Sequence, residues 1–411
     1  MSGIAGLRGT GDWGTDERPK NFREMILFRN PSGMAPIFAM SSKAGKKSVD
    51  DPEFSWWDEP NDIIRLQVNG ALASGDTTVV VDSADPSSSS PGLVYGTATH
   101  LKAGDLLMVE PAAESATFTL ATHELLEVVS VQSDTQFTVR RGAGGTTAGT
   151  IADDLFLLLV GSAYAEGTSV PQAVSKNPIK WSNYTQIFKD TYELTGTASE
   201  TKTRTGDPWS NDKKRKMFKH SADIEWAMLF GRPYETVGSN GKPLRYMAGL
   251  RHFVPNYHFS TAVTMDSFIT NTSSVFDFDS GAGDTRMMFL GRQAATELNQ
   301  ILVATTGTRM ELGNTTTVYG RKFRELHTLD GTLLMSTHPL FSRHAVYKKS
   351  AVIIDWDSFK YVHMKGRDMK SKDDVQTKDE DLRRGFFQSE VSTMVDRSGL
   401  TMKFLTNISA T

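Results

Sequence analysis

The pattern of hydrophobic and polar positions changes twice along this chain. Between residues 36 and 66, apolar side chains stand among acids and lysines without a regular period, which predicts a long loop. From residue 67 to about 164, short β-branched runs alternate with turns rich in Gly, Ser and Pro. A strongly helical segment then covers residues 210–231. The pattern therefore predicts an α+β protein in which a strand-rich unit interrupts the rest of the chain.

The strand-rich unit contains no helical pattern between its runs. Closely spaced strands of this kind are typical of a small β-barrel or sandwich. The strands are predicted at 77–82, 106–110, 123–131, 136–141 and 155–160.

The helical segment has an amphipathic pattern and clear end signals. Ser210 or Asn211 is expected to cap its N-terminus, and Gly231 and Pro233 are expected to end it. Its apolar face is predicted to consist of Phe218, Ala222, Trp226 and Leu229, with Ile224 and Met228 beside it.

The remaining sequence predicts a second mixed region. An arm is expected at 1–21, followed by a short helix at 21–28 and, much later, a helix at 292–305. Polar loops are expected at 365–381. Further strands are predicted at 250–259, 319–327, 332–338, 351–356, 386–395 and 400–408.

The composition excludes several classes of protein. The chain has 411 residues and a formal net charge of -3, which argues against a dedicated nucleic-acid binder. It has no cysteine, so disulfides, thiolate metal sites and cysteine nucleophiles are all excluded. The N-terminus resembles no secretory signal, and the longest strongly apolar run, 155–160, is far shorter than a membrane helix.

Candidate catalytic and metal sites are weak. Residues 277–284 alternate carboxylates with glycines but lack the further ligands of a calcium loop, so an ordinary turn is favoured. Ser336, His338 and Asp330 have no surrounding nucleophile elbow or oxyanion loop. His252 and His258 do not have metal-ligand spacing. We expect no catalytic residue, no metal site and no cofactor.

Two groups of residues are candidates for contacts with other molecules. The basic cluster on the predicted helix should face DNA phosphates or an acidic partner, with a solvated helix face as the alternative. It comprises Lys213, Lys214, Arg215, Lys216 and Lys219. The second group should contact a neighbouring subunit, because large aromatic side chains on loops are rarely left in water. It comprises Trp13, Lys43, Lys46, Lys47, Phe54, Trp56 and Trp57.

The order of these segments resembles the major capsid protein of tailed bacteriophages with the Hong Kong 97 fold, in the variant with a β-domain inserted in the extended loop. Nearly the whole chain takes part in the resemblance. The residues that carry it are the block 23–31 with 35–38, the segments 104–107 and 139–142, the exit 165–167, the segments 183–188 and 195–197, Tyr319 and Gly320 onward to Leu333, His338 with Pro339, and 366–368.

The resemblance implies a division of the chain. It places an N-terminal arm at 1–35, the extended loop at 36–66 and 165–208, and the inserted barrel-like β-domain at 67–164. The peripheral domain would comprise 209–255 and 360–411, with the spine helix at 210–231, and the axial domain would comprise 256–359.

The family's function implies partners. The chain is expected to assemble into hexamers and pentamers of an icosahedral head around double-stranded DNA, forming part of the virion after assembly in the bacterial cytoplasm. A portal, a separate scaffolding protein and an optional decoration protein are implied, and no membrane. The separate scaffold is expected because fold-like sequence begins by Phe22. A lysine–asparagine cross-link, known in some members, has no matching motif here. The alternatives are another virion component, from the tail or portal, and thirdly a hydrolase.

Overall fold

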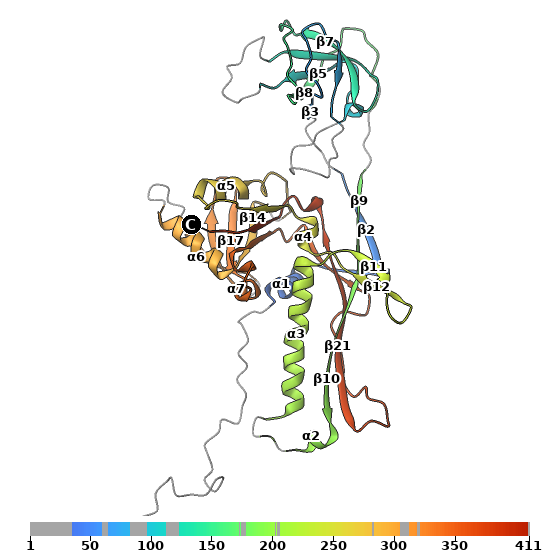
Figure 1. Ribbon diagram of the computed structural model, residues 1–411, viewed down its shortest axis with the longest axis vertical. Coiled ribbons are helices and arrows are strands. Elements are labelled where there is room, and N and C mark those ends of the chain that lie inside the picture. Colours follow the sequence, from blue (N-terminus) through green and yellow to red (C-terminus); the bar gives the residue numbers. More distant parts are fainter. Residues whose placement is uncertain are drawn as a thin grey trace, which may run out of the picture.

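The computed structural model describes residues 35–59, 65–82, 97–111, 123–171, 173, 178–201, 203, 206–281, 283–304, 312–318 and 321–409. These residues form three bodies along the long axis of the molecule (Figure 1). A six-stranded sheet stands at one end, a seven-stranded sheet with helices lies in the middle, and a long helix beside long strands forms the other end.

The long helix, α3 (Pro208–Phe230), has 23 residues and so extends about 35 Å. It lies beside a five-stranded sheet in which β10 (Gln186–Thr195) pairs with β21 (Leu382–Val395) over ten positions. The sheet continues through β19 (Phe359–Met364) to β1 (Lys46–Val49), while β20 (Lys370–Lys372) also pairs with β21. A short helix, α2 (Gly196–Glu200), follows β10 at the tip.

The predicted spine helix exists, but its start and its buried face differ from prediction. Asp207, and neither Ser210 nor Asn211, caps the helix by accepting hydrogen bonds from the N–H groups of Trp209 and Ser210. Pro208 at the first helical position needs no N–H partner, so the helix begins earlier than expected. Phe218, predicted on the apolar face, is 41% exposed. The buried positions are Trp209, His220, Ile224, Glu225, Met228 and Leu229.

The end of α3 follows the prediction and depends on glycine. Gly231 is the C-cap, and a Cβ atom there would stand 2.3 Å from the carbonyl oxygen of Met247 and 2.7 Å from that of Ala227. Only glycine permits this close approach between the helix end and the following segment.

The middle body is a mixed seven-stranded sheet. Its strands, in spatial order, are β13 (Asn256–His258), β22 (Lys403–Thr406), β18 (Ala351–Ile354), β14 (Thr285–Leu290), β17 (Thr332–Thr337), β16 (Arg321–His327) and β15 (Leu312–Val318). The helices of this body are α4 (Leu250–Phe253), α5 (Met265–Ser273), α6 (Arg292–Ala304) and α7 (Pro339–Arg343). Short 3-10 turns lie at Tyr347–Lys349 and Arg397–Gly399.

The six-stranded sheet forms the third body. Its strands, in spatial order, are β3 (Arg65–Gln67), β8 (Phe156–Ser162), β5 (Asp105–Val109), β6 (Leu125–Val131), β7 (Gln136–Ala143) and β4 (Thr78–Val80). The two outer strands meet through a bridge between Val68 and Val81, so this sheet curls back on itself. A 3-10 turn lies at Ala98–His100. All five strands predicted in this part of the chain are confirmed, with each end within two residues of the prediction.

Two small antiparallel pairs complete the described chain. One joins β2 (Glu53–Asp58) to β9 (Ile179–Tyr184), the segments that lead to and from the six-stranded sheet. The other joins β11 (Tyr234–Val237) to β12 (Pro243–Tyr246).

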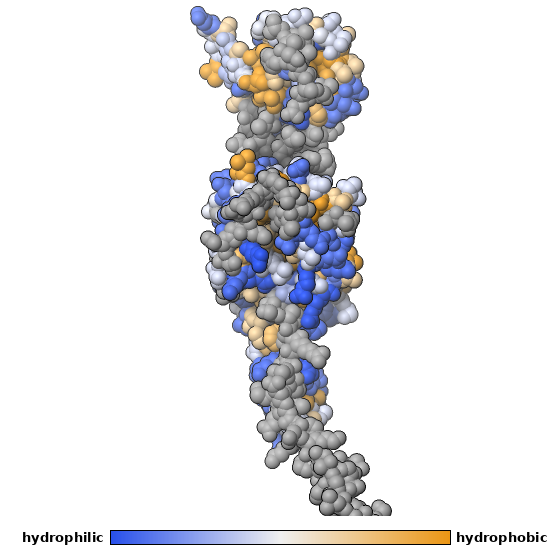
Figure 2. Space-filling model, turned by 90° about the vertical axis from the view of Figure 1, so that its left-hand side faces the viewer, coloured by the Kyte–Doolittle hydropathy of each residue, from blue (hydrophilic) through white to orange (hydrophobic). Residues whose placement is uncertain are grey.

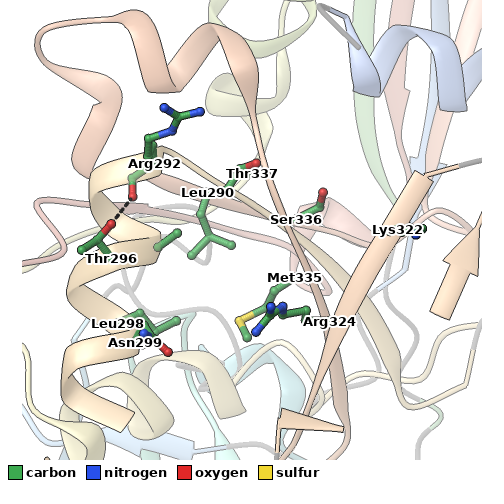
Figure 3. A pocket seen from close by; sticks show the side chains of 11 residues that line it. Leu290, Arg292, Thr296, Leu298, Asn299, Lys322, Arg324, Met335, Ser336 and Thr337 are labelled. Carbon is green, nitrogen blue, oxygen red and sulfur yellow. Dashed lines mark hydrogen bonds between the residues drawn. The ribbon is translucent and has the colours of Figure 1, made fainter. Parts of the chain in front are cut away.

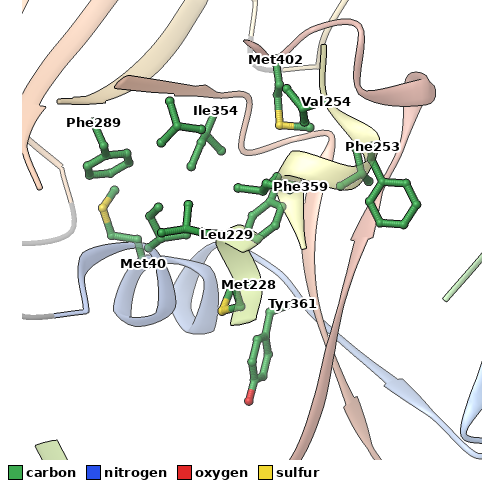
Figure 4. Close-up of a cluster of buried hydrophobic side chains, with 14 of the residues drawn as sticks. Met40, Met228, Leu229, Phe253, Val254, Phe289, Ile354, Phe359, Tyr361 and Met402 are labelled. Carbon is green, nitrogen blue, oxygen red and sulfur yellow. The ribbon is translucent and has the colours of Figure 1, made fainter. Parts of the chain in front are cut away.

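The bodies have separate cores. The largest cluster joins the N-terminal helix α1 (Pro36–Ala44) to α3, to the five-stranded sheet and to one face of the seven-stranded sheet. Figure 4 shows Met40 of α1 beside Leu229 and Met228 of α3, with Phe289, Ile354 and Phe359 around them. A second cluster fills the seven-stranded sheet's other face, and a third consists solely of residues of the six-stranded sheet and its turns.

Several predictions from local sequence are wrong because distant pairing decides the structure. The expected loop at 36–66 contains α1, β1 and β2, which gain partners only when β19 and β9 lie beside them. Residues 186–195, assigned to the extended loop, form β10 on the spine sheet. The strand expected at 250–259 is helix α4 followed by the short β13.

Three further outcomes concern the second half. Residues 403–406, assigned to the peripheral domain, form β22 of the seven-stranded sheet, and the expected loop at 365–381 contains β20. The helix at 292–305 is confirmed as α6, and the strands at 332–338 and 351–356 as β17 and β18. The expected helix at 21–28 lies outside the described residues.

Candidate assembly site: the spine helix and the surfaces beside it

The basic cluster on α3 is largely paired within its own chain. Lys213 Nζ lies 2.6 Å from Asp373 Oδ2, and Arg215 lies 3.0 Å from Asp212. Lys213 stands in the second helical turn, since the first turn is formed by residues 208–211. The positive end of the helix dipole therefore has little effect on these cations, because the dipole effect fades beyond the first turn.

Lys219 lies at the exposed edge of a buried polar network. Its Nζ contacts Asp190 at 2.9 Å and Asp223 at 2.7 Å, and both carboxylates raise the pKa of this lysine. The other oxygen of Asp190 lies 2.8 Å from Nδ1 of the fully buried His220, whose Nε2 lies 2.9 Å from the Ser389 hydroxyl. Burial alone would raise the pKa of Asp190, but the hydrogen bonds from Lys219 and His220 hold it below its usual value.

This aspartate–histidine–serine arrangement has the residue types of a hydrolytic triad without the access that one needs. His220 and Ser389 are 0% exposed, so no substrate can reach the hydroxyl. The network instead joins α3 to β10 and β21, which carry Asp190 and Ser389.

Glu225 forms a second buried junction on the same helix. Its carboxylate accepts hydrogen bonds from the N–H groups of Ile37, at 3.0 Å, and Phe38, at 2.6 Å. Nε2 of His338, the N-cap residue of α7, lies 2.8 Å from the same carboxylate. Glu225 and His338 are both completely buried. One carboxylate thus connects the start of α1, the spine helix and the middle body.

Sequence reasoning missed both junctions, although a signal was present. His220 precedes Ile224 and Met228 at four-residue intervals, and Glu225 precedes Leu229 by four. Both polar residues therefore share the stripe of buried apolar residues, where an unpaired charge would be costly. Polar residues at such positions predict buried partners, but the sequence alone does not say which.

The aromatic contact candidates separate into two kinds. Trp56 is 5% exposed, and its Nε1 donates to the carbonyl oxygen of Val395, while its ring packs on Phe253. Phe54 stacks on Trp56. The interpretation of Trp56 as a contact to another subunit is therefore wrong, because it is part of its own chain's core. Trp57 points the other way and is 62% exposed.

The remaining candidates have varied surroundings. Lys46 is bound to Asp368 at 2.9 Å, and Lys47 Nζ lies 3.6 Å from the sulfur of Met394. Lys43 lies in α1, but its side chain, like the whole of Trp13, is outside the described residues.

The weak catalytic and calcium candidates are occupied by other interactions. His338 faces Glu225, while Ser336 accepts a hydrogen bond from Arg321 Nε, so these two residues do not form a triad with Asp330. In the segment 277–284, the buried Arg286 donates to the carbonyl oxygens of Phe278 and Gly283. A guanidinium group therefore uses oxygens that a cation would need.

A profile of the SU10 major capsid protein family matches residues 8–400. The chain belongs to this family. A major capsid protein of Pseudomonas phage PaMx41 is 28% identical over 385 residues, which cover 90% of this chain and 84% of the relative.

Solved structures with a similar trace include the capsid of a native GTA particle, at a TM-score of 0.45 and 7% identity, covering 96% of each chain. Another is a chain from Mycobacterium phage Patience, at a TM-score of 0.38 and 11% identity, covering 61% of this chain and 78% of that one. The family assignment rests on the sequence matches alone.

The family membership confirms the resemblance to phage major capsid proteins. The chain is a structural protein of a phage capsid and not an enzyme, and as such it forms part of the virion. Within the described part of the chain, no helix has both the length and the apolar character to cross a membrane.

Proposed function

We propose that this chain adopts the Hong Kong 97 arrangement and assembles as hexamers and pentamers into an icosahedral head around double-stranded DNA. The observation that carries the proposal is the family match across residues 8–400. The elongated body with a spine helix beside long paired strands supports it.

In this proposal, the six-stranded sheet is a barrel-like domain inserted in the extended loop. Its core contains no residue of the other two bodies, and β2 and β9, which lead to it and from it, lie side by side. An insertion whose ends lie close together can fold without disturbing the parent body.

The basic cluster contributes two residues to the proposed interior or to an acidic partner. Lys214 and Lys216 have no ion-pair partner among the described residues, unlike Lys213, Arg215 and Lys219. These two lysines can neutralise phosphates, and binding through them should weaken as salt concentration rises.

Electron microscopy of the full chain, produced with and without its phage's scaffolding protein, tests the assembly proposal. Closed shells of uniform diameter are expected when the scaffold is present. Rings or tubes would instead identify a tail or portal component, and a small particle in both preparations would contradict the proposal.

A further inference from the structure

We propose that Trp57 of one subunit inserts into a recess between α6 and strands β16 and β17 of a second copy of this chain. The contact rests on the proposed function, because it forms only when subunits assemble. It specifies which two surfaces meet.

The protruding element is the outer face of β2. Side chains alternate along a strand, so Trp56 enters the core while Glu53, Ser55 and Trp57 face outward. Glu59 is exposed just beyond the strand, and Lys180 of β9 lies opposite Trp57. The outer face therefore carries an exposed indole, with Glu53 on the same strand, Glu59 just beyond it and Lys180 on the paired strand.

The recess has the complementary character. It encloses about 480 Å³ and has an apolar floor of Leu290, Leu298 and Met335. Three cations, Arg292, Lys322 and Arg324, stand around it, and none of its lining residues is acidic. Figure 3 shows Arg324 close to Met335, with α6 on the other side of the floor.

This combination suits an indole flanked by carboxylates. The apolar floor can remove the ring from water, since a buried Trp contributes roughly 150–250 Å² of contact. A guanidinium group over its face adds a cation–π interaction. Glu53 and Glu59, on either side of Trp57 along the chain, can then approach the surrounding cations.

The positions of the two surfaces indicate a second copy and not a small ligand. Figure 1 shows β2 and β9 on one side of the molecule and α6 on the opposite side. A protrusion and a recess on opposite sides of one chain produce head-to-tail contacts, which close into rings when the rotation allows. Seen from the α6 side, the coloured surface of the middle body is mostly hydrophilic (Figure 2).

Disulfide trapping tests the contact directly, because the chain contains no cysteine of its own. A double variant, Trp57→Cys with Asn299→Cys, is assembled and oxidised. Asn299 lines the recess. We expect a ladder of covalent oligomers on non-reducing gels. The matched control, Val170→Cys with Asn299→Cys, places the first thiol at another exposed position and should give no ladder.

A second variant measures the energetic role. Trp57→Ala should fold like the wild type but need on the order of tenfold more protein to assemble, whereas Trp57→Phe should lose much less. The contact would be overturned if the double-cysteine variant formed shells without the ladder, or if Trp57→Ala assembled at the same concentration as the wild type. Either outcome would leave the proposed function intact. If the wild type forms no shell, the proposed function fails, and the contact fails with it.

Discussion

The replacement Glu225→Ala should be the most damaging single change in the largest core. The carboxylate is completely buried and satisfies two backbone N–H groups and the imidazole of His338. Removing it leaves three donors without their acceptor, and those of Ile37 and His338 are fully buried. An unsatisfied buried donor costs about 1–3 kcal/mol, and breaking a buried pair costs about 3–5 kcal/mol, so we expect a loss of about 3–5 kcal/mol.

Urea unfolding followed by tryptophan fluorescence measures this loss, because Trp56 and Trp226 belong to or pack against the same core. Glu225→Gln should lose less stability, because its amide oxygen still accepts hydrogen bonds. It should not match the wild type, because its NH2 group would face one of the donors that the carboxylate satisfied. The matched control is Glu166→Ala at an exposed turn, which should change the free energy of unfolding by less than about 0.5 kcal/mol. If the Glu225→Ala and Glu166→Ala midpoints coincide, the junction does not stabilise the fold.

Three further changes test other parts of the structure. Gly231→Ala should lower the unfolding midpoint, because the added Cβ would meet backbone carbonyl oxygens. Gly45→Ala is the control, since a Cβ there meets open space, and its midpoint should stay close to that of the wild type. Equal midpoints for the two variants would contradict this reasoning. Lys219→Gln should destabilise the fold by about 1 kcal/mol at most, because Lys219 is more than half exposed. Lys214→Gln should leave the stability unchanged, and thermal unfolding of the two variants measures the difference. The pKa of Asp190 is lower in the folded state than in the unfolded state, where it is about 3.9. The contribution of Asp190 to folding stability is therefore complete above the unfolded pKa and is lost as the pH falls through the folded pKa. The stability difference between wild type and Asp190→Asn should therefore shrink below about pH 4; a difference that is constant from pH 3 to 7 would refute the assignment.

Local sequence patterns predicted the elements whose signals are themselves local. The turns and β-branched runs between 77 and 160 gave β4 to β8 because tight turns and alternating side chains need no distant partner to be recognised. The end of α3 at Gly231 was also predictable. Its start was missed because Asp207 is the cap and Pro208 the first helical residue, three and two residues before Ser210.

The long-range parts could not be predicted in this way. Strand β1 has no apolar alternation, and its pairing with β19 joins residues more than 300 positions apart. The burial of Trp56 depends on Phe253 and Val395, which no local pattern connects to it. The partners of Glu225 likewise come from α1 and α7. For the same reason, Lys213, Arg215 and Lys219 resembled part of a binding surface until their acidic neighbours were placed.

The distribution of buried polar junctions indicates where this subunit can adapt its shape. Helix α3 is tied to β10 and β21 through His220, and to α1 and α7 through Glu225, so sliding it past any of them would break hydrogen bonds in a dry core. The six-stranded sheet shares no core residue with these parts. It is reached through β2 and β9, a two-stranded ribbon that Trp56 and Asn183 hold on the main body of the subunit. Differences in subunit shape between positions of a shell should therefore concentrate in the placement of the six-stranded sheet, while the ribbon, α3 and its four partners move as one body.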